Sequence, residues 1–272
     1  MLCYNCTKKK RVFVTLFDAL ILGALEGVTE FLPISSTGHL ILASQLLGLE
    51  QTNAHKAFEV SIQLGSILAV LFLYAQRLLQ DKMLWLKIGV AFLPAGALGF
   101  LFYKQIKALF GVETVSIMLI AGGIVFLIFE YLRRNKPIDA GKDVSELTFK
   151  EAFTIGVFQS LSMIPGTSRS GATLIGGLVM GLSRKSAAEF SFLLAIPTMI
   201  ITTAYDLLKH RNEMVVDDYF MLTVAFITAF VFALATVKLF VAFVSRHTFT
   251  PFAIYRIVVG LIFFYFVAAL PA

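Results

Sequence analysis

The sequence predicts an all-α polytopic membrane protein with two inverted-topology repeats, each a re-entrant helical hairpin followed by three transmembrane helices. The first observation is composition: 58% of the 272 residues are hydrophobic and 15% are charged, whereas a soluble domain carries roughly 25% charged residues. The second is a series of apolar runs long enough to cross the hydrocarbon core, which takes roughly 20 helical residues. The third is the similarity between two interrupted apolar regions, one in each half.

The N-terminal residues 1–11 are predicted to form a tail. Cys3 and Cys6 form an isolated C-x-x-C without a second pair, so the sequence does not favour a zinc or redox site there. The apolar run that follows contains Asp18 and lacks a small-residue cleavage site, so we expect it to remain attached. The net charge is +6, but the basic residues lie in short loops rather than in a stripe, so we interpret them as topology signals and exclude nucleic acid as a partner.

The first repeat is predicted over 12–132 and the second over 152–272, with a polar loop over 133–151 between them. Each repeat begins with a hairpin, at 12–48 and at 152–182. The expected transmembrane spans are 58–76, 84–103, 114–132, 188–208, 219–244 and 252–270.

Both hairpin regions are interrupted at their centres by residues that break helices. The first contains Phe31-Leu-Pro-Ile-Ser-Ser-Thr-Gly-His39, and the second contains Met163-Ile-Pro-Gly-Thr-Ser-Arg-Ser-Gly171. Irregular backbone at membrane depth is tolerated where protein or water satisfies its polar groups. The interruptions therefore predict an internal polar cavity.

The two regions align with a constant offset of 133 residues, which pairs Gly23 with Gly156 and Ser35 with Ser168. An odd number of crossings in each half would place the second half upside down relative to the first. We therefore expect the two loops to enter from opposite faces and to meet near the midplane. When the basic cluster at 8–11 is discounted, Lys and Arg favour the face of the 133–151 loop, which places that loop in the cytoplasm and both termini outside.

Glu26 and Glu30 are four residues apart, so on a helix they share one face. An ionisable group at membrane depth costs on the order of 2.5–3.5 kcal/mol, so these carboxylates need a partner. The candidates are a divalent cation, a shared proton or Arg169 from the second loop. Alternatively, Glu26 lies at an aqueous helix end and caps it.

The first loop continues with Ser35, Ser36, Thr37 and Gly38, followed by His39. Hydroxyl groups at a helix N-terminus can cap the helix, and together with free N–H groups they can also bind phosphate oxygens. His39 is placed to transfer a proton or to attack phosphorus, or else it is a packing residue.

The second loop has the same design, with an arginine at the position equivalent to Ser36. Its glycines allow tight turns, its hydroxyls donate hydrogen bonds, and the planar guanidinium of Arg169 suits phosphate oxygens. The alternative for Arg169 is a structural ion pair with Glu26 or Glu30. The residues expected to bind a diphosphate are Ser35, Thr37, Gly166, Ser168, Arg169, Ser170, Gly171 and Thr173.

Other embedded charges lie at or near predicted span ends, where snorkelling or interhelical pairing is the usual explanation. These residues are Glu59, Glu130, Glu189, Lys238 and Arg256. Glu59 and Gln63 share a helix face and are candidates to support the cavity.

The two loop motifs, from Glu26 to His39 and from Pro165 to Thr173, closely resemble those of the undecaprenyl-diphosphate phosphatase family, also called the bacitracin-resistance protein family. The phrases Phe58-Glu-Val-Ser-Ile-Gln-Leu-Gly65, Glu189-Phe-Ser-Phe-Leu-Leu-Ala-Ile-Pro197 and Pro251-Phe-Ala-Ile-Tyr-Arg256 extend the resemblance over nearly the whole chain.

The resemblance implies hydrolysis of undecaprenyl diphosphate to undecaprenyl phosphate and inorganic phosphate in the bacterial cytoplasmic membrane, at a site open to the outer face. It implies a divalent cation, commonly Mg²⁺, and often a homodimer. We expect Glu26 and Glu30 to hold this ion, or one of them to activate the nucleophile. Catalytic interest falls on the following residues: Glu26, Glu30, Ser36, His39, Ser168, Arg169 and Thr173. The choice of nucleophile among Ser36, His39 and a metal-held water stays open.

Two alternatives belong to other classes. A transporter or flippase for a polyprenyl phosphate would use the same inverted-repeat cavity and anion site. An acid-phosphatase-type lipid phosphatase would have a histidine six residues after its arginine, and Ile175 stands at that position, so this alternative fails.

Overall fold

The structure is a computed structural model that describes residues 13–109, 111–138, 140–209 and 219–269. Regular structure in these ranges is helical, apart from an isolated bridge between Lys142 and Leu182. The first half contains α1 (Leu16–Thr29), α2 (Ser36–Leu46), α3 (Asn53–Gln80), α4 (Lys82–Leu101), α5 (Tyr103–Ala108) and α6 (Val112–Arg133). The second half contains η1 (Val144–Glu146), α7 (Phe149–Ser160), η2 (Leu161–Met163), α8 (Arg169–Val179), α9 (Arg184–Lys209), α10 (Tyr219–Val244) and α11 (Thr250–Ala269).

Five of these helices are long and apolar enough to cross a membrane, over Ala54–Gln80, Lys82–Leu101, Val112–Arg133, Arg184–Tyr205 and Tyr219–Val244. Helix α11 adds an apolar stretch over Thr250–Tyr265. The all-helical polytopic membrane protein that the sequence predicts is therefore confirmed.

Some helix ends differ from the predicted ones. The expected span 84–103 ends at Leu101, because Phe102 leaves the helical region with φ −111° and ψ 23°. The 133–151 segment is not all loop, since η1 begins after Asp143, whose side chain accepts from the Ser145 N–H.

The hairpin helices start at equivalent capping boxes. Helix α1 is capped by Thr15 and Asp18, and α7 is capped by Thr148 and Glu151. In each box the threonine hydroxyl accepts from a backbone N–H, and the acidic side chain accepts from the threonine N–H. The second box explains why α7 begins at Phe149, three residues before the predicted hairpin.

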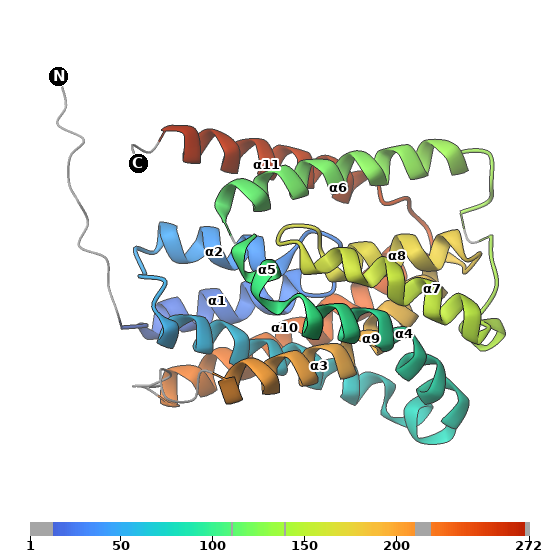
Figure 1. Cartoon of the computed structure of the whole chain (residues 1–272), viewed down its shortest axis with the longest axis horizontal. Coiled ribbons are helices and arrows are strands. Elements are labelled where there is room, and N and C mark those ends of the chain that lie inside the picture. Colours follow the sequence, from blue (N-terminus) through green and yellow to red (C-terminus); the bar gives the residue numbers. More distant parts are fainter. Residues whose placement is uncertain (1–12, 110, 139, 210–218, 270–272) are drawn as a thin grey trace.

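The two hairpins lie at opposite ends of the molecule, with α1 and α2 at one end and α7 and α8 at the other (Figure 1). Helix α1 packs against α10, and α7 packs against α4. Both contacts use a glycine: a Cβ on Gly23 would lie 2.4 Å from the Ala225 carbonyl oxygen, and one on Gly156 would lie 2.0 Å from that of Ala91. Helices α6 and α11 pack together along one side of the molecule (Figure 1).

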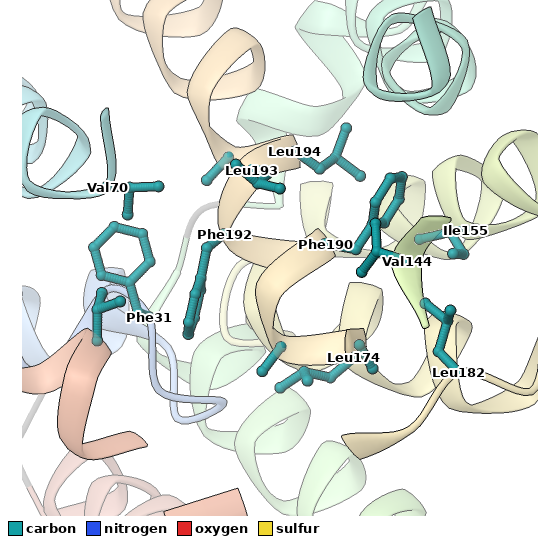
Figure 2. Packing of buried hydrophobic residues seen from close by; sticks show 14 of the residues in the cluster. Phe31, Val70, Val144, Ile155, Leu174, Leu182, Phe190, Phe192, Leu193 and Leu194 are labelled. Carbon is teal, nitrogen blue, oxygen red and sulfur yellow. The ribbon is translucent and has the colours of Figure 1, made fainter. Parts of the chain in front are cut away.

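The largest hydrophobic cluster fastens the first loop to α9. Phe31 is fully buried and meets Phe192 of α9 edge-on, with ring centroids 5.3 Å apart (Figure 2). Leu193 and Leu194 continue the cluster along α9. Because tightly packed side chains resist displacement, this core fixes where the polar residues beside Phe31 lie.

Candidate active site

Helices α2 and α8 are each directly preceded by a serine with an unusual backbone conformation. Ser35 has φ 71° and Ser168 has φ 74°, and these are the two non-glycine residues with positive φ in the described part of the chain. Such conformations cost energy and persist where the surrounding structure holds them. The Ser168 hydroxyl accepts from the Gly171 N–H at 3.1 Å, whereas Ser35 makes no side-chain cap.

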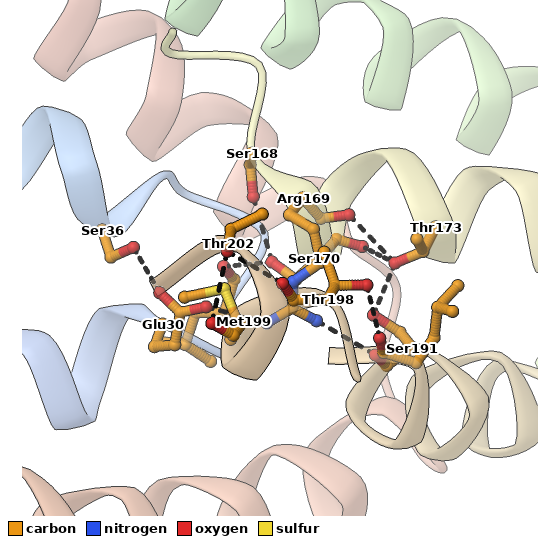
Figure 3. Close-up of polar contacts among 12 residues, drawn as sticks. Glu30, Ser36, Ser168, Arg169, Ser170, Thr173, Ser191, Thr198, Met199 and Thr202 are labelled. Carbon is orange, nitrogen blue, oxygen red and sulfur yellow. Dashed lines mark hydrogen bonds and ion pairs between the residues drawn. The ribbon is translucent and has the colours of Figure 1, made fainter. Parts of the chain in front are cut away.

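Glu30 joins the two loops. Its Oε2 accepts from Ser36 Oγ at 2.6 Å, and its Oε1 accepts from Arg169 Nη2 at 2.8 Å (Figure 3). The Glu30 and Arg169 side chains are only 5% and 10% exposed, so this ion pair is shielded from water. The structure thus brings together three residues that the sequence analysis singled out from separate segments.

Arg169 is held on its other side by α9. Its Nη1 donates to the Ser191 carbonyl oxygen at 3.0 Å, and the Ser191 and Thr173 hydroxyls lie 2.6 Å apart (Figure 3). The guanidinium carbon lies 5.8 Å from the centre of the Phe31 ring. Ser191 was not predicted, although it stands within the Glu189–Pro197 phrase.

The remaining residues of the second loop fix its path. Ser170 Oγ donates to the Leu32 carbonyl oxygen at 2.7 Å and lies 3.0 Å from Ser168 Oγ, so Ser170 ties the loops together. Gly166 has φ 91°, and a Cβ there would lie 2.5 Å from the Val115 carbonyl oxygen, so both the conformation and the space require glycine.

In the first loop, Thr37 is half-buried in the first turn of α2. A Cβ on Gly38 would lie 3.1 Å from Val115 Cγ1 of α6, so Gly38 allows α2 to approach that helix.

Glu26 is fully buried beside the Glu30 carboxyl group, and within the described ranges neither of its carboxylate oxygens accepts a hydrogen bond from a donor group. The charged side chains that interact electrostatically with Glu26 are Glu30, Glu59 and Arg169. The alternative that Glu26 caps an aqueous helix end is therefore wrong. Within the described ranges, there is no group of three or more His, Cys, Asp or Glu residues that could hold a metal ion, and a metal on Glu26 and Glu30 stays a prediction.

His39 is turned toward α11 and is not hydrogen-bonded to Glu30 or Ser36. Its Nδ1 lies 2.7 Å from the Ser35 carbonyl oxygen and its Nε2 lies 2.7 Å from the Tyr255 hydroxyl. A carbonyl oxygen can only accept, so Nδ1 carries a proton, and in the neutral ring Nε2 accepts from Tyr255. The rings also stack, with centroids 5.6 Å apart. Sequence reasoning missed Tyr255, although it lies within the Pro251–Arg256 phrase.

Arg256 lies in the second turn of α11, near a span end as the sequence analysis expected, but its side chain does not snorkel to water. It is 1% exposed, and its guanidinium donates to backbone carbonyl oxygens of both loops and of α6. The acceptors are those of Pro33, Met118, Leu119, Gly166 and Thr167. A lone arginine within the apolar 252–270 run is the signal that could have indicated this role.

The other embedded glutamates pair with neighbours, as the sequence analysis expected. Glu189 binds Arg77 at 2.7 Å, and Glu130 binds Arg184. Glu59 accepts from Ser44 Oγ at 2.9 Å and lies 3.1 Å from His55 Nε2. The support of the cavity by Glu59 and Gln63 stays a prediction.

Comparisons with known proteins show the family of this chain. The family model described as "Bacitracin resistance protein BacA" matches residues 19–262. An undecaprenyl-diphosphatase from Wolinella succinogenes is 57% identical over 251 residues, covering 92% of this chain and 98% of that protein. One from Persephonella marina is also 57% identical, over 93% of this chain and 99% of that protein. One from Campylobacter jejuni is 52% identical, over 91% of this chain and 92% of that protein. The chain belongs to the BacA bacitracin resistance protein family.

Proposed function

We propose that this protein hydrolyses undecaprenyl diphosphate to undecaprenyl phosphate and inorganic phosphate. The observation that carries the proposal is the shielded arrangement of Ser36, Glu30 and Arg169, which places a hydroxyl on a carboxylate and a guanidinium beside both. Hydrolysis of a phosphoric anhydride needs an activated nucleophile and neutralisation of the phosphoryl oxygens. The names of the relatives, undecaprenyl-diphosphatases, indicate which substrate to propose.

We assign Ser36 as the nucleophile and Glu30 as its general base. Ser36 Oγ would form a bond to the terminal phosphorus while the bond from that phosphorus to the bridging oxygen breaks, and the hydroxyl proton would pass to Glu30. Undecaprenyl phosphate leaves with the bridging oxygen. Water then attacks the phosphoserine, the Oγ–P bond breaks, and Glu30 returns its proton to Ser36 as phosphate departs.

Arg169 would neutralise the transferred phosphoryl group. Its Nη2 is bonded to Glu30 and its Nη1 to the Ser191 carbonyl, so its planar fork is oriented before substrate arrives. The Nε–H of Arg169 is buried and finds no hydrogen-bond partner among the residues that the structure describes, so a donor remains for a phosphate oxygen. Thr173 supports this geometry through Ser191.

We propose that Glu26 and Glu30 hold a Mg²⁺ ion. Mg²⁺ is usually held by one or two carboxylates together with substrate phosphates, and the two unpartnered oxygens of Glu26 beside Glu30 offer that donor set. When bound, the ion would offset negative charge on the diphosphate. We expect phosphate release to stop with a chelator and to return when Mg²⁺ is restored; release that persists in chelator would exclude the metal.

The experiment measures phosphate release from undecaprenyl diphosphate by the detergent-purified chain and by Ser36→Ala, Glu30→Gln and Arg169→Ala variants. Glu189→Gln is the matched control, because Glu189 is also a partly buried glutamate paired to an arginine but lies in the ion pair with Arg77. We expect release by the unsubstituted chain and by the control, and loss in the three variants. If well-folded protein moves lipid between leaflets of vesicles without releasing phosphate, the flippase alternative replaces the phosphatase.

We also propose that the two halves form inverted repeats with re-entrant hairpins, and that the site opens to the outer face. The 133-residue offset supports this, because it relates the two capping boxes, the positive φ of Ser35 and Ser168, and the positive φ of Gly48 and Gly181. The packing of α1 on α10 and of α7 on α4 follows the same relation.

Membrane sidedness can be tested with single cysteines in a chain whose Cys3 and Cys6 are replaced by serine. Glu50 and Lys136 are exposed, one after the first hairpin and one in the loop between the halves. We expect an impermeant maleimide added to intact cells to label Glu50→Cys and to leave Lys136→Cys unlabelled until the cells are opened. The reverse pattern would overturn the proposed orientation, and labelling of both from outside would exclude the inverted arrangement.

A further inference from the structure

We propose that Arg256 is a positioning residue that holds the turns before α2 and α8 in register, so that Glu30 and Ser36 meet Arg169. The expected effect of Arg256 on catalysis rests on the proposed phosphatase function. Its contact with the two turns rests on geometry alone. Arg256 lies on α11, far in sequence from both turns.

The hydrogen bonds of Arg256 join three separate segments. Nη1 donates to the Pro33 carbonyl oxygen at 2.9 Å in the first turn. Nη2 donates to the carbonyl oxygens of Gly166 and Thr167 at 3.1 and 3.0 Å in the second turn. Nε and Nη2 also reach the carbonyl oxygens of Leu119 and Met118 on α6, at 3.3 and 3.0 Å. A planar guanidinium with five N–H groups is the side chain suited to such a set.

The bonded carbonyls stand beside the strained residues. The Thr167 carbonyl directly precedes Ser168, which has φ 74°, and Pro33 stands two residues before Ser35, which has φ 71°. The peptide group is planar, so binding the Thr167 oxygen turns the Ser168 N–H away from Arg256. Conformations of this kind persist where neighbours over-determine them. Arg256 therefore supplies an external hold at both strained turns.

Arg256 is a buried cation without an acidic partner. It is 1% exposed, and the described ranges place no carboxylate within ion-pair distance of it. Burying a cation is costly, so the bonds to the backbone must offset that cost. The other deeply buried arginine, Arg184, differs because it is paired with Glu130. Arg184 is therefore a matched control for burial.

Gly122 of α6 gives a second way to disturb Arg256 without changing it. A Cβ on Gly122 would lie 2.0 Å from Nη2 and 2.6 Å from Cζ of Arg256, so an alanine there must displace the guanidinium. Among the described residues, nothing lies within 4 Å of a Cβ built on Gly89 of α4, so Gly89→Ala is the matched control. Both substitutions replace a helical glycine by alanine and raise helix propensity equally, so a difference between them does not come from helix propensity.

The test compares Arg256→Lys and Gly122→Ala with Arg184→Lys and Gly89→Ala, using kcat and KM for phosphate release. Lysine keeps the charge but loses the planar fork, and a misplacement of about 1 Å at a reacting centre can cost about 100-fold in rate. We expect kcat per folded molecule to fall at least about tenfold for Arg256→Lys and Gly122→Ala, with a smaller change in KM. The controls should stay within about twofold of the unsubstituted chain.

A distance measurement separates positioning from stability. Leu46 and Val179 end α2 and α8 and are both exposed, so spin labels on cysteines there report how the two helices sit relative to each other. In a chain with Cys3 and Cys6 replaced by serine, we expect Arg256→Lys and Gly122→Ala to broaden the interspin distance distribution.

Unchanged distances, or unchanged kcat with altered distances, would overturn the inference. If Arg256→Lys does not fold, Gly122→Ala decides the outcome by the same measures. If the unsubstituted chain releases no phosphate, the proposed function fails, while the distance distributions still decide whether Arg256 holds the turns.

Discussion

Replacing Glu30 by glutamine and Ser36 by alanine, singly and together, tests whether the two residues act as one catalytic unit. Ser36 Oγ donates to Glu30 Oε2 at 2.6 Å, and the Glu30 side chain is 5% exposed. Glutamine has nearly the same shape as glutamate and can still accept through its carbonyl oxygen, but it cannot take the hydroxyl proton. Alanine removes the proposed nucleophile.

The expected loss in rate follows from the proposed role of Glu30 as general base. General base catalysis contributes about 10²–10⁴ in rate, or about 3–5 kcal/mol in the activation barrier at 1.36 kcal/mol for each factor of ten. If the residues acted independently, the losses in the double variant would multiply to at least about 10⁴. Residues that act as a unit are strongly non-additive. We therefore expect Glu30→Gln/Ser36→Ala to be about as slow as Ser36→Ala alone.

The assay is phosphate release at saturating substrate, divided by the folded fraction from thermal unfolding. This correction matters because removing the Glu30 charge leaves Arg169 buried without its counter-ion, and breaking a buried pair costs about 3–5 kcal/mol of stability. Losses that multiply in the double variant would refute the serine–glutamate pair. Full activity of Ser36→Ala would refute the nucleophile.

Three further outcomes are expected. Tyr255→Phe should lower the free energy of unfolding by about 1 kcal/mol, because it removes the hydrogen bond to His39 Nε2. Lys142 binds Glu151 and, with the Thr148 N–H, lowers the pKa of Glu151 from 4.5 to about 2. A carboxyl group whose pKa is lower in the folded than in the unfolded protein stabilises the fold at a pH above its unfolded pKa. The stabilisation from Glu151 should therefore be lost as pH falls from about 4.5 toward 2, and it should be smaller in Lys142→Met. Arg184→Met should lower the free energy of unfolding by about 3–5 kcal/mol and leave kcat per folded molecule unchanged.

Each outcome has a contradicting result. Equal free energies of unfolding for Tyr255→Phe and the unsubstituted chain would show that this hydrogen bond does not stabilise the fold. Identical stability-versus-pH curves for Lys142→Met and the unsubstituted chain, measured by thermal unfolding, would exclude the Glu151 contribution. A kcat loss in Arg184→Met that persists after correction for folded protein would connect that ion pair to the site.

Local signals in the sequence were sufficient for the helical breaks and for much of the site. Pro33 and the Pro165–Gly166 pair end helices because of backbone sterics, and this effect depends on a few neighbouring residues. The four-residue spacing of Glu26 and Glu30 likewise follows from helix geometry. Arg169 was a candidate partner of Glu30 because each is costly to bury alone.

The helix ends were less predictable, because capping and turn geometry decide them within one or two residues. Helix α7 starts three residues before the predicted hairpin, where Thr148 and Glu151 form a capping box. The 84–103 span was predicted from apolar length, but the backbone of Phe102 ends the helix.

By itself, the sequence determined the membrane setting, the two interrupted hairpins and the residues of the two loops, because apolar length and helix-breaking residues act locally. Only the tertiary structure decided the partners that come from distant segments. Ser191 beneath Arg169, Tyr255 on His39 and Arg256 on both turns could not be inferred from spacing. Their roles depend on how α9 and α11 pack beside the loops, and that packing is set by contacts between residues far apart in the chain.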